Sequence, residues 1–387
     1  MAHYNFPKVP TPSFATSDPL SAPDWASLLG RTEPENGPVR IPCIAGASVL
    51  VTGAGGFIGA EMVRILAASG AAKIVLLDIC EQYLFDISAE MAELGRISPN
   101  PAPRCIAALG SVNDAALLDA LFAEHRPEIV VHAAALKHVP LMESNAIAAV
   151  AANALGTWTV AQTAERHAAR QMLLVSTDKA AAPAGIMGAA KRIAELVMLA
   201  PSPTRRAALR LVNVIGSPGS AGPLFAAQIA RGGPVTVTHP DARRWFFTLA
   251  QTVRLLGQAI CSQLTGLLVP DPGEPLLIAD LARRMVAASG RDVPIVFTEP
   301  RPGEKIDETL LAPDEQLGLY ASGLLRRVAS PADDRLESRL TALESAVVAR
   351  DGVEMLRLVC ELVPAYQASA VVRASIQPHS EAAAILP

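Results

Sequence analysis

The chain has 387 residues and a formal net charge of −4. That charge argues against a general nucleic-acid binder, because such proteins usually carry a basic stripe. No uninterrupted apolar run reaches the roughly 18 residues that indicate a membrane helix, and the N-terminus lacks the basic region and apolar core of a signal peptide. We therefore expect a protein that binds no nucleic acid and does not insert into a membrane.

The five cysteines are Cys43, Cys80, Cys105, Cys261 and Cys360. They form no C-x-x-C pair and no metal-ligand spacing, so no metal site is predicted. An odd, scattered set of thiols is typical of a reducing compartment, which makes the cytoplasm the expected location.

Residues 1–45 are rich in proline, serine and threonine and show little periodic hydrophobicity, which predicts an extended or mobile segment. Within it, the sequence W-A-S-L-L-G-R at 25–31 carries apolar side chains that could dock on the folded body. A simple linker is the favoured interpretation on composition.

A glycine-rich turn follows the first apolar segment. Residues 47–52 form a predicted buried strand, and G-A-G-G-F-I-G comes directly after it, before a predicted helix that ends near Ser69. Glycines let the backbone approach a pyrophosphate, whose charge is stabilised by free N–H groups at a helix start. The predicted cofactor-binding residues of this turn are Gly53, Gly56, Phe57, Ile58 and Gly59.

The second predicted strand, residues 73–77, is followed by Asp78. An acidic residue about 20 positions beyond a glycine turn binds the ribose hydroxyls of a dinucleotide. Asp78 would repel a 2′-phosphate, and residues 79–81 supply no cation, so NAD is favoured over NADP. The pattern predicts an α/β fold with a Rossmann-type doubly wound parallel sheet and a smaller C-terminal substrate-binding lobe.

Two further predicted strands carry candidate cofactor contacts. One begins at residue 105 and ends in G-S-V-N-D, and the other, residues 129–135, is apolar enough for a central parallel strand. Its small C-terminal residues would let a cofactor lie against the backbone. Asn153, in a predicted helix at 146–168, could brace the end of the next strand. The cofactor-binding candidates in these segments are Ser111, Val112, Ala133, Ala134, Ala135 and Asn153.

The stretch L-K-H-V-P-L-M-E-S-N at 136–145 concentrates charged side chains at the carboxyl edge of the predicted sheet. Binding loops occur at that edge in parallel sheets. Lys137, His138 and Glu143 are therefore candidate substrate-binding residues, and Lys137 is also a candidate cofactor contact. A solvated loop is the alternative interpretation.

The strand predicted at 172–177 leads into S-T-D-K, which places a hydroxyl, an acid and a base in consecutive positions. Thr177, Asp178 and Lys179 are therefore candidate catalytic residues, with a surface ion pair as the alternative. A short-chain dehydrogenase would normally show Tyr-x-x-x-Lys after this loop, but Met187 occupies the tyrosine position. Met187 and Lys191 are four residues apart and share a helix face.

The predicted second lobe contains two candidate binding segments. Residues 239–248 place arginines, including Arg244, beside aromatic side chains, which suits a phosphate and a sugar or base face, although a structural aromatic cluster is the alternative. The loop E-P-R-P-G-E-K at 299–305, with Arg301 and Glu304, is either a surface turn or a nucleotide clamp. Asn213 lies in the last predicted core strand, 208–215.

These segments predict four regions. They are an extended or mobile segment at 1–45, an NAD-binding Rossmann domain at 46–216, a mixed α/β substrate-binding lobe at 217–330, and C-terminal helices with a mobile tail at 331–387. The helices of the last region are expected within 331–364 and the mobile part in the final twenty or so residues.

Six motifs occur in order between residues 25 and 366, namely V-T-G-A-G-G-F-I-G, H-A-A-A-L-K-H-V-P-L-M-E-S-N, S-T-D-K-A, M-G-A-A-K-R, G-G-P-V-T-V-T-H-P-D and R-P-G-E-K. Together they resemble the bacterial polysaccharide-biosynthesis nucleotide-sugar dehydratases, particularly the UDP-N-acetylglucosamine 4,6-dehydratase group. Met187 resembles the methionine-bearing branch, which usually retains configuration at C5. The L-L-G-R at 28–31 resembles the segment before this domain in membrane-anchored members, although we expect no anchor here.

The resemblance implies a mechanism in which NAD oxidises the C4 hydroxyl of a UDP-sugar and thereby acidifies the C5 proton. Lys179 is then similar to the base that removes this proton, and Asp178 to the acid that protonates the departing C6 hydroxyl, before hydride returns to C6. Thr177 would contact the C4 oxygen and Lys191 would hold the cofactor. The residues that would grip the UDP-sugar are Asn213, Arg244, Arg301 and Glu304.

Four positions depart from the family pattern. Phe57 replaces a usual serine, Ser111 an aspartate, Ala182 an asparagine and Pro218 an arginine. A changed sugar nucleotide or a weakened enzyme fits these departures at least as well as the standard substrate.

Two other functions therefore compete with the dehydratase. They are a UDP-sugar epimerase, which would use the same ketone intermediate, and a non-catalytic NAD-binding member of a glycan assembly complex. By resemblance, we also expect a homo-oligomer whose dimer face is the helix pair at 147–167 and 186–199.

Overall fold

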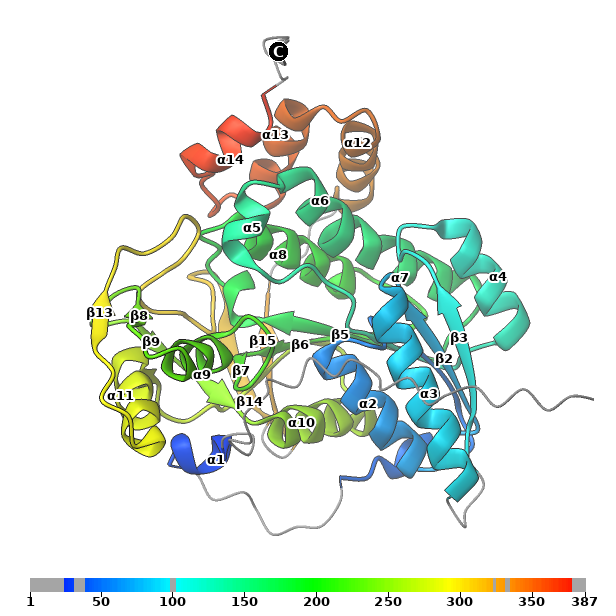
Figure 1. The fold of residues 1–387 in the computed structure, drawn as a ribbon. Coiled ribbons are helices and arrows are strands. Elements are labelled where there is room, and N and C mark those ends of the chain that lie inside the picture. Colours follow the sequence, from blue (N-terminus) through cyan, green and yellow to red (C-terminus); the bar gives the residue numbers. More distant parts are fainter. Residues whose placement is uncertain (1–23, 31–38, 98–101, 323–324, 331–334, 378–387) are drawn as a thin grey trace, which may run out of the picture.

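The computed structural model describes residues 24–30, 39–97, 102–322, 325–330 and 335–377 (Figure 1). A nine-stranded sheet lies at its centre, in the order β14-β15-β11-β6-β5-β4-β1-β2-β3. Its strands are β1 (Ser48–Thr52), β2 (Lys73–Asp78), β3 (Arg104–Leu109), β4 (Ile129–His132), β5 (Gln171–Thr177), β6 (Arg205–Leu211), β11 (Gly266–Pro270), β14 (Gln316–Ser322) and β15 (Leu325–Ala329).

The strands from β3 to β11 pair in parallel, and β15 and β14 add an antiparallel edge. The order β3-β2-β1-β4-β5-β6 is that of a Rossmann sheet, in which ligands bind at the carboxyl ends of the strands. The predicted α/β class and Rossmann-type sheet are confirmed.

Helices cover both faces of the sheet, so its strands are apolar throughout. Along β1 the side chains alternate between two hydrophobic clusters, with Leu50 in one and Val49 and Val51 in the other. The helices that cover one face are α2 (Phe57–Ala68), α3 (Glu81–Ile97) and α10 (Leu249–Ser262), and those on the other are α4 (Ala115–His125), α6 (Ala146–Val150), α7 (Gly156–Arg166) and α8 (Ile186–Leu199).

Several elements differ from the prediction. Helix α3 was not predicted, and the expected loop at 136–145 contains the short helix α5 (Val139–Glu143). The single helix expected at 146–168 consists of α6, the π-helical turn η2 (Ala151–Leu155) and α7 in succession.

The second lobe has its own hydrophobic core, which includes Phe225, Val235 and Leu281. Its elements are β7 (Asn213–Val214), α9 (Ala221–Ala230), β8 (Val235–Val237), β9 (Arg243–Arg244), β10 (Phe246–Phe247), β12 (Leu276–Leu277), α11 (Ile278–Ser289) and β13 (Ile295–Phe297). Strands β11, β14 and β15 come from the region assigned to this lobe, yet they join the central sheet. A single boundary at residue 216 therefore does not separate the sheet from the lobe.

The N-terminal helix α1 (Trp25–Leu28) docks on the second lobe. A Cβ atom at Gly216 or Gly222 would lie 2.7 Å or 2.8 Å from the Trp25 indole, so the two glycines admit this ring. The linker interpretation is therefore wrong for residues 24–30. The expectation of an extended or mobile segment is also wrong for residues 41–44, where Ile41 and the short helix η1 (Pro42–Ile44) enter the core. The rest of the expected N-terminal segment, 1–23 and 31–38 with Arg31, lies outside the described residues.

The C-terminal helices α12 (Leu336–Val348), α13 (Gly352–Leu362) and α14 (Ala370–Ser375) lie over α5, α6 and α8 (Figure 1). Every residue of α8 from Ile186 to Met198 is buried. Helix α8 of the pair predicted as a dimer face is therefore buried by this chain's own elements, so the face expected of α8 is not exposed to a second copy. The predicted mobile tail contains α14, and its remainder, 378–387, lies outside the described residues.

In the described parts of the chain, no helix combines the length and the apolar character needed to cross a membrane. One disulfide joins Cys43 in η1 to Cys261 in α10, 218 positions further along the chain, whereas Cys80, Cys105 and Cys360 are free. Disulfides persist mainly in oxidising compartments, so this pairing is at odds with the expected reducing location.

Removing this disulfide is expected to destabilise the protein. The serine double variant of Cys43 and Cys261 should lose about 2–5 kcal/mol of unfolding free energy, the usual loss for a native disulfide, whereas Cys80→Ser should lose much less. Urea unfolding without reductant measures both. Alkylation of the denatured, unreduced protein should label three cysteines, the free ones named above. Labelling of all five before reduction would contradict the disulfide.

Candidate active site

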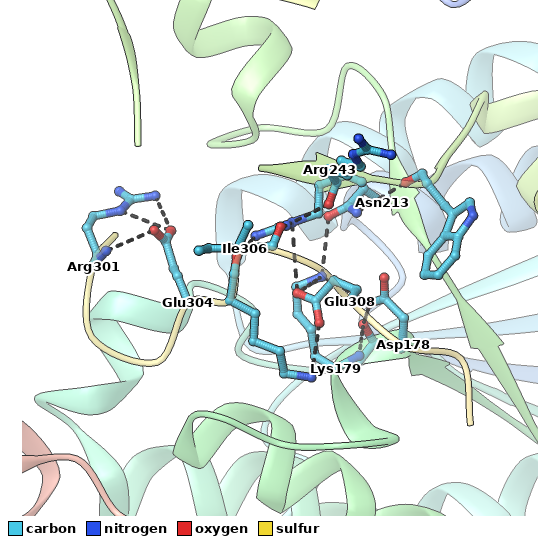
Figure 2. Close-up of polar contacts among 12 residues, drawn as sticks. Asp178, Lys179, Asn213, Arg243, Arg301, Glu304, Ile306 and Glu308 are labelled. Atoms are coloured by element: carbon cyan, nitrogen blue, oxygen red, sulfur yellow. Dashed lines mark hydrogen bonds and ion pairs between the residues drawn. The ribbon is translucent and has the colours of Figure 1, made fainter. Parts of the chain in front are cut away.

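The three consecutive catalytic candidates meet at the carboxyl end of β5, where Figure 2 labels Asp178 and Lys179. Asp178 begins the short helix η3 (Asp178–Ala180), and its Oδ1 accepts hydrogen bonds from Thr177 Oγ1 at 2.9 Å and Lys179 Nζ at 3.0 Å. Lys179 Nζ also donates to Asn213 Oδ1 at 3.3 Å. The structure thus brings together a hydroxyl, a carboxyl and an amine, the groups needed for acid–base chemistry.

Asp178 and Lys179 differ in their surroundings. Asp178 is fully buried, and its Oδ2 has no hydrogen-bond partner among the described residues. A buried polar atom without a partner is costly, and a protonated carboxyl could donate from this oxygen to a ligand. Burial disfavours the Lys179 ammonium, but the Asp178 and Glu308 carboxylates outweigh burial and raise the pKa of Lys179.

Glu308 belongs to this cluster and was missed from the sequence. Its Oε1 lies 3.6 Å from Lys179 Nζ and 3.8 Å from Arg244 Nε, and its Oε2 lies 3.4 Å from Lys305 Nζ. The only sequence signal was its place three residues after the charged loop at 299–305. A glutamate after such a loop has no distinctive pattern, because its contacts come from three separate segments.

Helix α8 carries the other two catalytic candidates. Met187 is buried, and Lys191 Nζ donates to the Val175 carbonyl of β5 at 2.7 Å. Burial lowers the pKa of Lys191 to about 8, although the Glu195 carboxylate opposes this shift. A Cβ at Gly188 would lie 2.5 Å from the Lys179 carbonyl oxygen, so this glycine lets α8 pack directly on the catalytic loop.

The glycine turn lies where the sequence placed it. Gly53 has a φ of +65°, and a Cβ there would lie 2.8 Å from the Ala134 backbone, close to Ala133 and just before Ala135. Helix α2 follows, and no described side chain caps its first N–H groups, at Phe57 and Ile58. Backbone N–H groups presented in this way bind pyrophosphate. The turn therefore fits a dinucleotide.

Asp78 is nearly buried at the end of β2. Its Oδ2 accepts from Gly55 N and its Oδ1 from Cys80 N, each at 2.9 Å. The carboxylate thus fixes the glycine turn while remaining at the edge where a ribose would lie. Phe57, in the same region, lines a cavity of about 430 Å³ with Trp25 and Thr248, so α1 forms one wall of a space beside the turn.

Asn153 is fully buried in η2, where it braces the loop that contains Lys137. Its side chain accepts from Leu136 N at 2.8 Å and donates to Leu136 O at 2.9 Å. Asn153 therefore supports the segment after β4. The prediction that it braces the end of the next strand was wrong. Val112 is buried near Gly156, and the hydroxyl of its neighbour Ser111 accepts from Asn113 N.

The predicted substrate contacts at 137 and 138 lie near the loop that carries Arg301. Burial lowers the pKa of Lys137, and burial followed by the charges of Lys137 and Arg301 lowers that of His138. The His138 ring packs against Gly219, where an added Cβ would lie 2.3 Å from its Cε1. Arg301 pairs with Glu304 at 2.6 Å in the exposed loop (Figure 2). The positive charges of Lys137 and Arg301 suit an anionic ligand.

Two residues predicted to contact the substrate, Glu143 and Arg244, form hydrogen bonds with other residues of the chain instead. Glu143 is fully buried, and its carboxylate accepts from Ile186 N at 2.8 Å and from the Ser369 hydroxyl at 2.6 Å. Arg244 donates to the carbonyl oxygens of Ile306 at 2.7 Å and Lys305 at 2.6 Å. Both contacts favour structural roles over direct substrate binding. Within the described residues, no group of three or more His, Cys, Asp or Glu side chains could hold a metal ion.

His132 is a buried neutral group beneath the glycine turn. Its Nδ1 lies 2.7 Å from Thr52 Oγ1 and its Nε2 lies 3.0 Å from Thr157 Oγ1. Burial, with a smaller contribution from Lys191, lowers its pKa to about 3. Thr52 also accepts from Ala134 N, so this network joins β1 to the end of β4.

Stability should therefore fall in acid because of His132. Unfolding restores the ordinary pKa of 6.5, so the unfolded chain binds the extra proton and stability falls as pH drops below 6.5 toward 3. This residue should contribute a loss of about 2 kcal/mol between pH 7 and pH 5. Urea unfolding of the protein and of His132→Asn at both pH values measures it. An equal pH dependence in the two proteins would contradict the assignment.

The parallel sheet and the glycine turn define a Rossmann-type protein, with the Thr-Asp-Lys cluster at the carboxyl edge of its sheet. The model of the polysaccharide biosynthesis protein family matches residues 49–325. The chain therefore belongs to this family.

The chain is 42% identical over 279 residues to the probable polysaccharide biosynthesis protein EpsC of Bacillus subtilis, an alignment that covers 70% of this chain and 46% of EpsC. It is 41% identical over 278 residues to the capsular polysaccharide biosynthesis protein CapD of Staphylococcus aureus, with coverages of 69% and 45%. The chain thus spans less than half the length of these two relatives. A UDP-glucose 4-epimerase of Rickettsia canadensis is 30% identical over 283 residues, with coverages of 70% and 81%.

Solved structures share the fold. Pen from Bacillus thuringiensis superposes with a TM-score of 0.66 at 22% identity and covers 78% of this chain and 98% of its own. DesIV from Streptomyces venezuelae, a dTDP-glucose 4,6-dehydratase with NAD and TYD bound, has a TM-score of 0.59 at 23% identity and coverages of 68% and 88%. These likenesses confirm the Rossmann-type architecture.

Proposed function

We propose that this protein is an NAD-dependent nucleotide-sugar 4,6-dehydratase that converts a UDP-N-acetylhexosamine, most readily UDP-N-acetylglucosamine, to its 4-keto-6-deoxy product. The observation that carries the proposal is the Thr177-Asp178-Lys179 cluster at the carboxyl end of β5, beside a glycine turn that fits a dinucleotide. Membership of the polysaccharide biosynthesis family supports it.

The glycine turn and Asp78 would hold NAD, which supplies the hydride acceptor and donor when bound. Free N–H groups at the start of α2 would receive the pyrophosphate, and Asp78 would meet the ribose hydroxyls and repel a 2′-phosphate. Lys191 would hold the cofactor beside β5. DesIV, of the same fold, has NAD bound, which supports this choice.

The cluster can carry the protons of a dehydration without a net gain or loss. The C4 hydroxyl proton would pass through Thr177 Oγ1 to Asp178, which accepts from that hydroxyl at 2.9 Å. Lys179 would remove the C5 proton as the amine, the minor form beside the Asp178 and Glu308 carboxylates. Asp178 would give its proton to the C6 oxygen, which leaves as water. Lys179 would then return a proton to C5 as hydride reaches C6. Thr177, Asp178 and Lys179 thus end the reaction in the protonation states in which they began it.

The direct test is incubation of the purified protein with NAD and UDP-N-acetylglucosamine, followed by mass spectrometry. The expected product is lighter than the substrate by one water, and Asp178→Asn should not form it, because the acid for C6 is lost. If no UDP-N-acetylhexosamine gives a product lighter than the substrate, the proposal is contradicted. An isomer of unchanged mass would instead support an epimerase, the second candidate, which the 30% identity to a UDP-glucose 4-epimerase favours.

A further inference from the structure

We propose that Glu308 is a positioning residue of this active site, a permanent anion that holds the Lys179 ammonium while Asp178 exchanges its proton. The inference rests on the proposed function for its catalytic meaning. Its structural part concerns only how the charge of Glu308 acts on Lys179.

Glu308 lies at the centre of three cations that come from separate segments (Figure 2). Only 3% of its side chain is exposed, and it faces Lys179 from η3, Arg244 from β9 and Lys305 from its own loop. Among described residues its Oε2 has no hydrogen-bond partner, and neither has Lys305 Nζ. Charge rather than a well-formed hydrogen-bond network therefore holds this carboxylate.

The segment that carries Glu308 is firmly fixed. Arg244 donates to the carbonyls of Lys305 and Ile306, and Arg243 N donates to Ile306 O at 3.1 Å. These bonds tie residues 305–306 to β9, two positions before Glu308. The carboxylate is thus presented to Lys179 by a braced backbone rather than by a free loop.

Two carboxylates share one ammonium in this arrangement. Asp178 bonds Lys179 at 3.0 Å, and Glu308 lies 3.6 Å away on another segment. In the proposed reaction Asp178 becomes neutral when it takes the C4 proton, so its attraction for Lys179 weakens. Burial opposes ionisation of Glu308, but Lys179, Arg244 and Lys305 outweigh it and lower the pKa of Glu308. Glu308 therefore keeps its charge throughout.

The charged groups that face Lys179 are Asp178, Glu308 and the more distant Arg244. Glu308→Gln removes one of the two anions and keeps the size of the side chain. The pKa of Lys179 should then fall by about one unit or more, the effect of an opposite charge at this range. The low-pH limb of the plot of kcat against pH should therefore shift to lower pH. The value of kcat at its optimum pH should fall about 100-fold, because Lys179 is misplaced.

The test uses NMR of the protein with labelled lysine side chains, with the Lys179 signal assigned from Lys179→Arg. Glu308→Gln should lower the Lys179 pKa, Glu308→Asp should restore most of it, and Asp307→Asn, an exposed neighbour of the same charge, should not change it. An unchanged pKa in Glu308→Gln, or in Glu308→Ala should Gln misfold, would overturn the proposal. Because the titration needs no turnover, it stands even if the dehydratase assignment fails.

Discussion

Replacing Lys179 with alanine is expected to lower kcat for dehydration roughly 100- to 10,000-fold, the usual scale for loss of a general base. The amine that removes the C5 proton is lost, whereas the glycine turn that would hold NAD is untouched. NAD affinity, measured by calorimetry, should therefore change little, and steady-state kinetics should show the loss mainly in kcat.

Lys179→Arg is the matched control for this experiment. Arginine keeps the positive charge beside Asp178 and Glu308, but its guanidinium does not give up a proton in proteins. Both variants should therefore be nearly inactive if Lys179 is a base. Near-normal turnover in Lys179→Arg would show that only the charge matters, and would move the base elsewhere.

The largest effect on stability is expected from Arg210→Leu. Arg210 is fully buried and bonds Glu195 at 2.7 Å and 2.8 Å, and Glu315 at 2.6 Å and 3.0 Å. Both carboxylates are fully buried, and among the described residues only the Arg192 guanidinium would remain as an ion-pair partner for them. Breaking a buried pair in this way costs about 3–5 kcal/mol, because charge is left without a partner.

Urea unfolding of Arg210→Leu measures this loss, and Arg357→Leu is its control. Arg357 also pairs with two glutamates, but its side chain is 52% exposed, so its replacement should lower the free energy of unfolding much less than that of Arg210. Equal losses in the two variants would contradict the special role of burial. Because Ser176 donates to Glu195 at 2.7 Å, Arg210→Leu should also disturb the catalytic strand.

Local patterns predicted well where the glycine turn and most of the neighbouring strands lie. The glycine turn follows β1, Asp78 ends β2, Thr177 ends β5 and Ala134 comes two residues after β4, so each lies within a few residues of an apolar run in the sequence. In a parallel sheet, all carboxyl ends meet at one edge, so position along the chain already implies position in space. This is why residues distant in sequence could be assigned to one site.

The substrate side was harder to predict because burial and partners there depend on distant segments. Arg244 and Glu143 looked like ligand contacts by charge, yet the first fixes residues 305–306 and the second holds the start of α8. Glu308 was missed for the converse reason, since its cations come from η3, β9 and its own loop. Likewise, nothing local marks Cys43 and Cys261 as a pair.

The central claim is that the sugar is dehydrated with its own hydride returned to C6. UDP-N-acetylglucosamine that carries deuterium at C4 tests it most directly, with the product examined by mass spectrometry and NMR. The account predicts a product lighter by one water that carries the deuterium at C6. An isomer of unchanged mass with the deuterium still at C4 would contradict it.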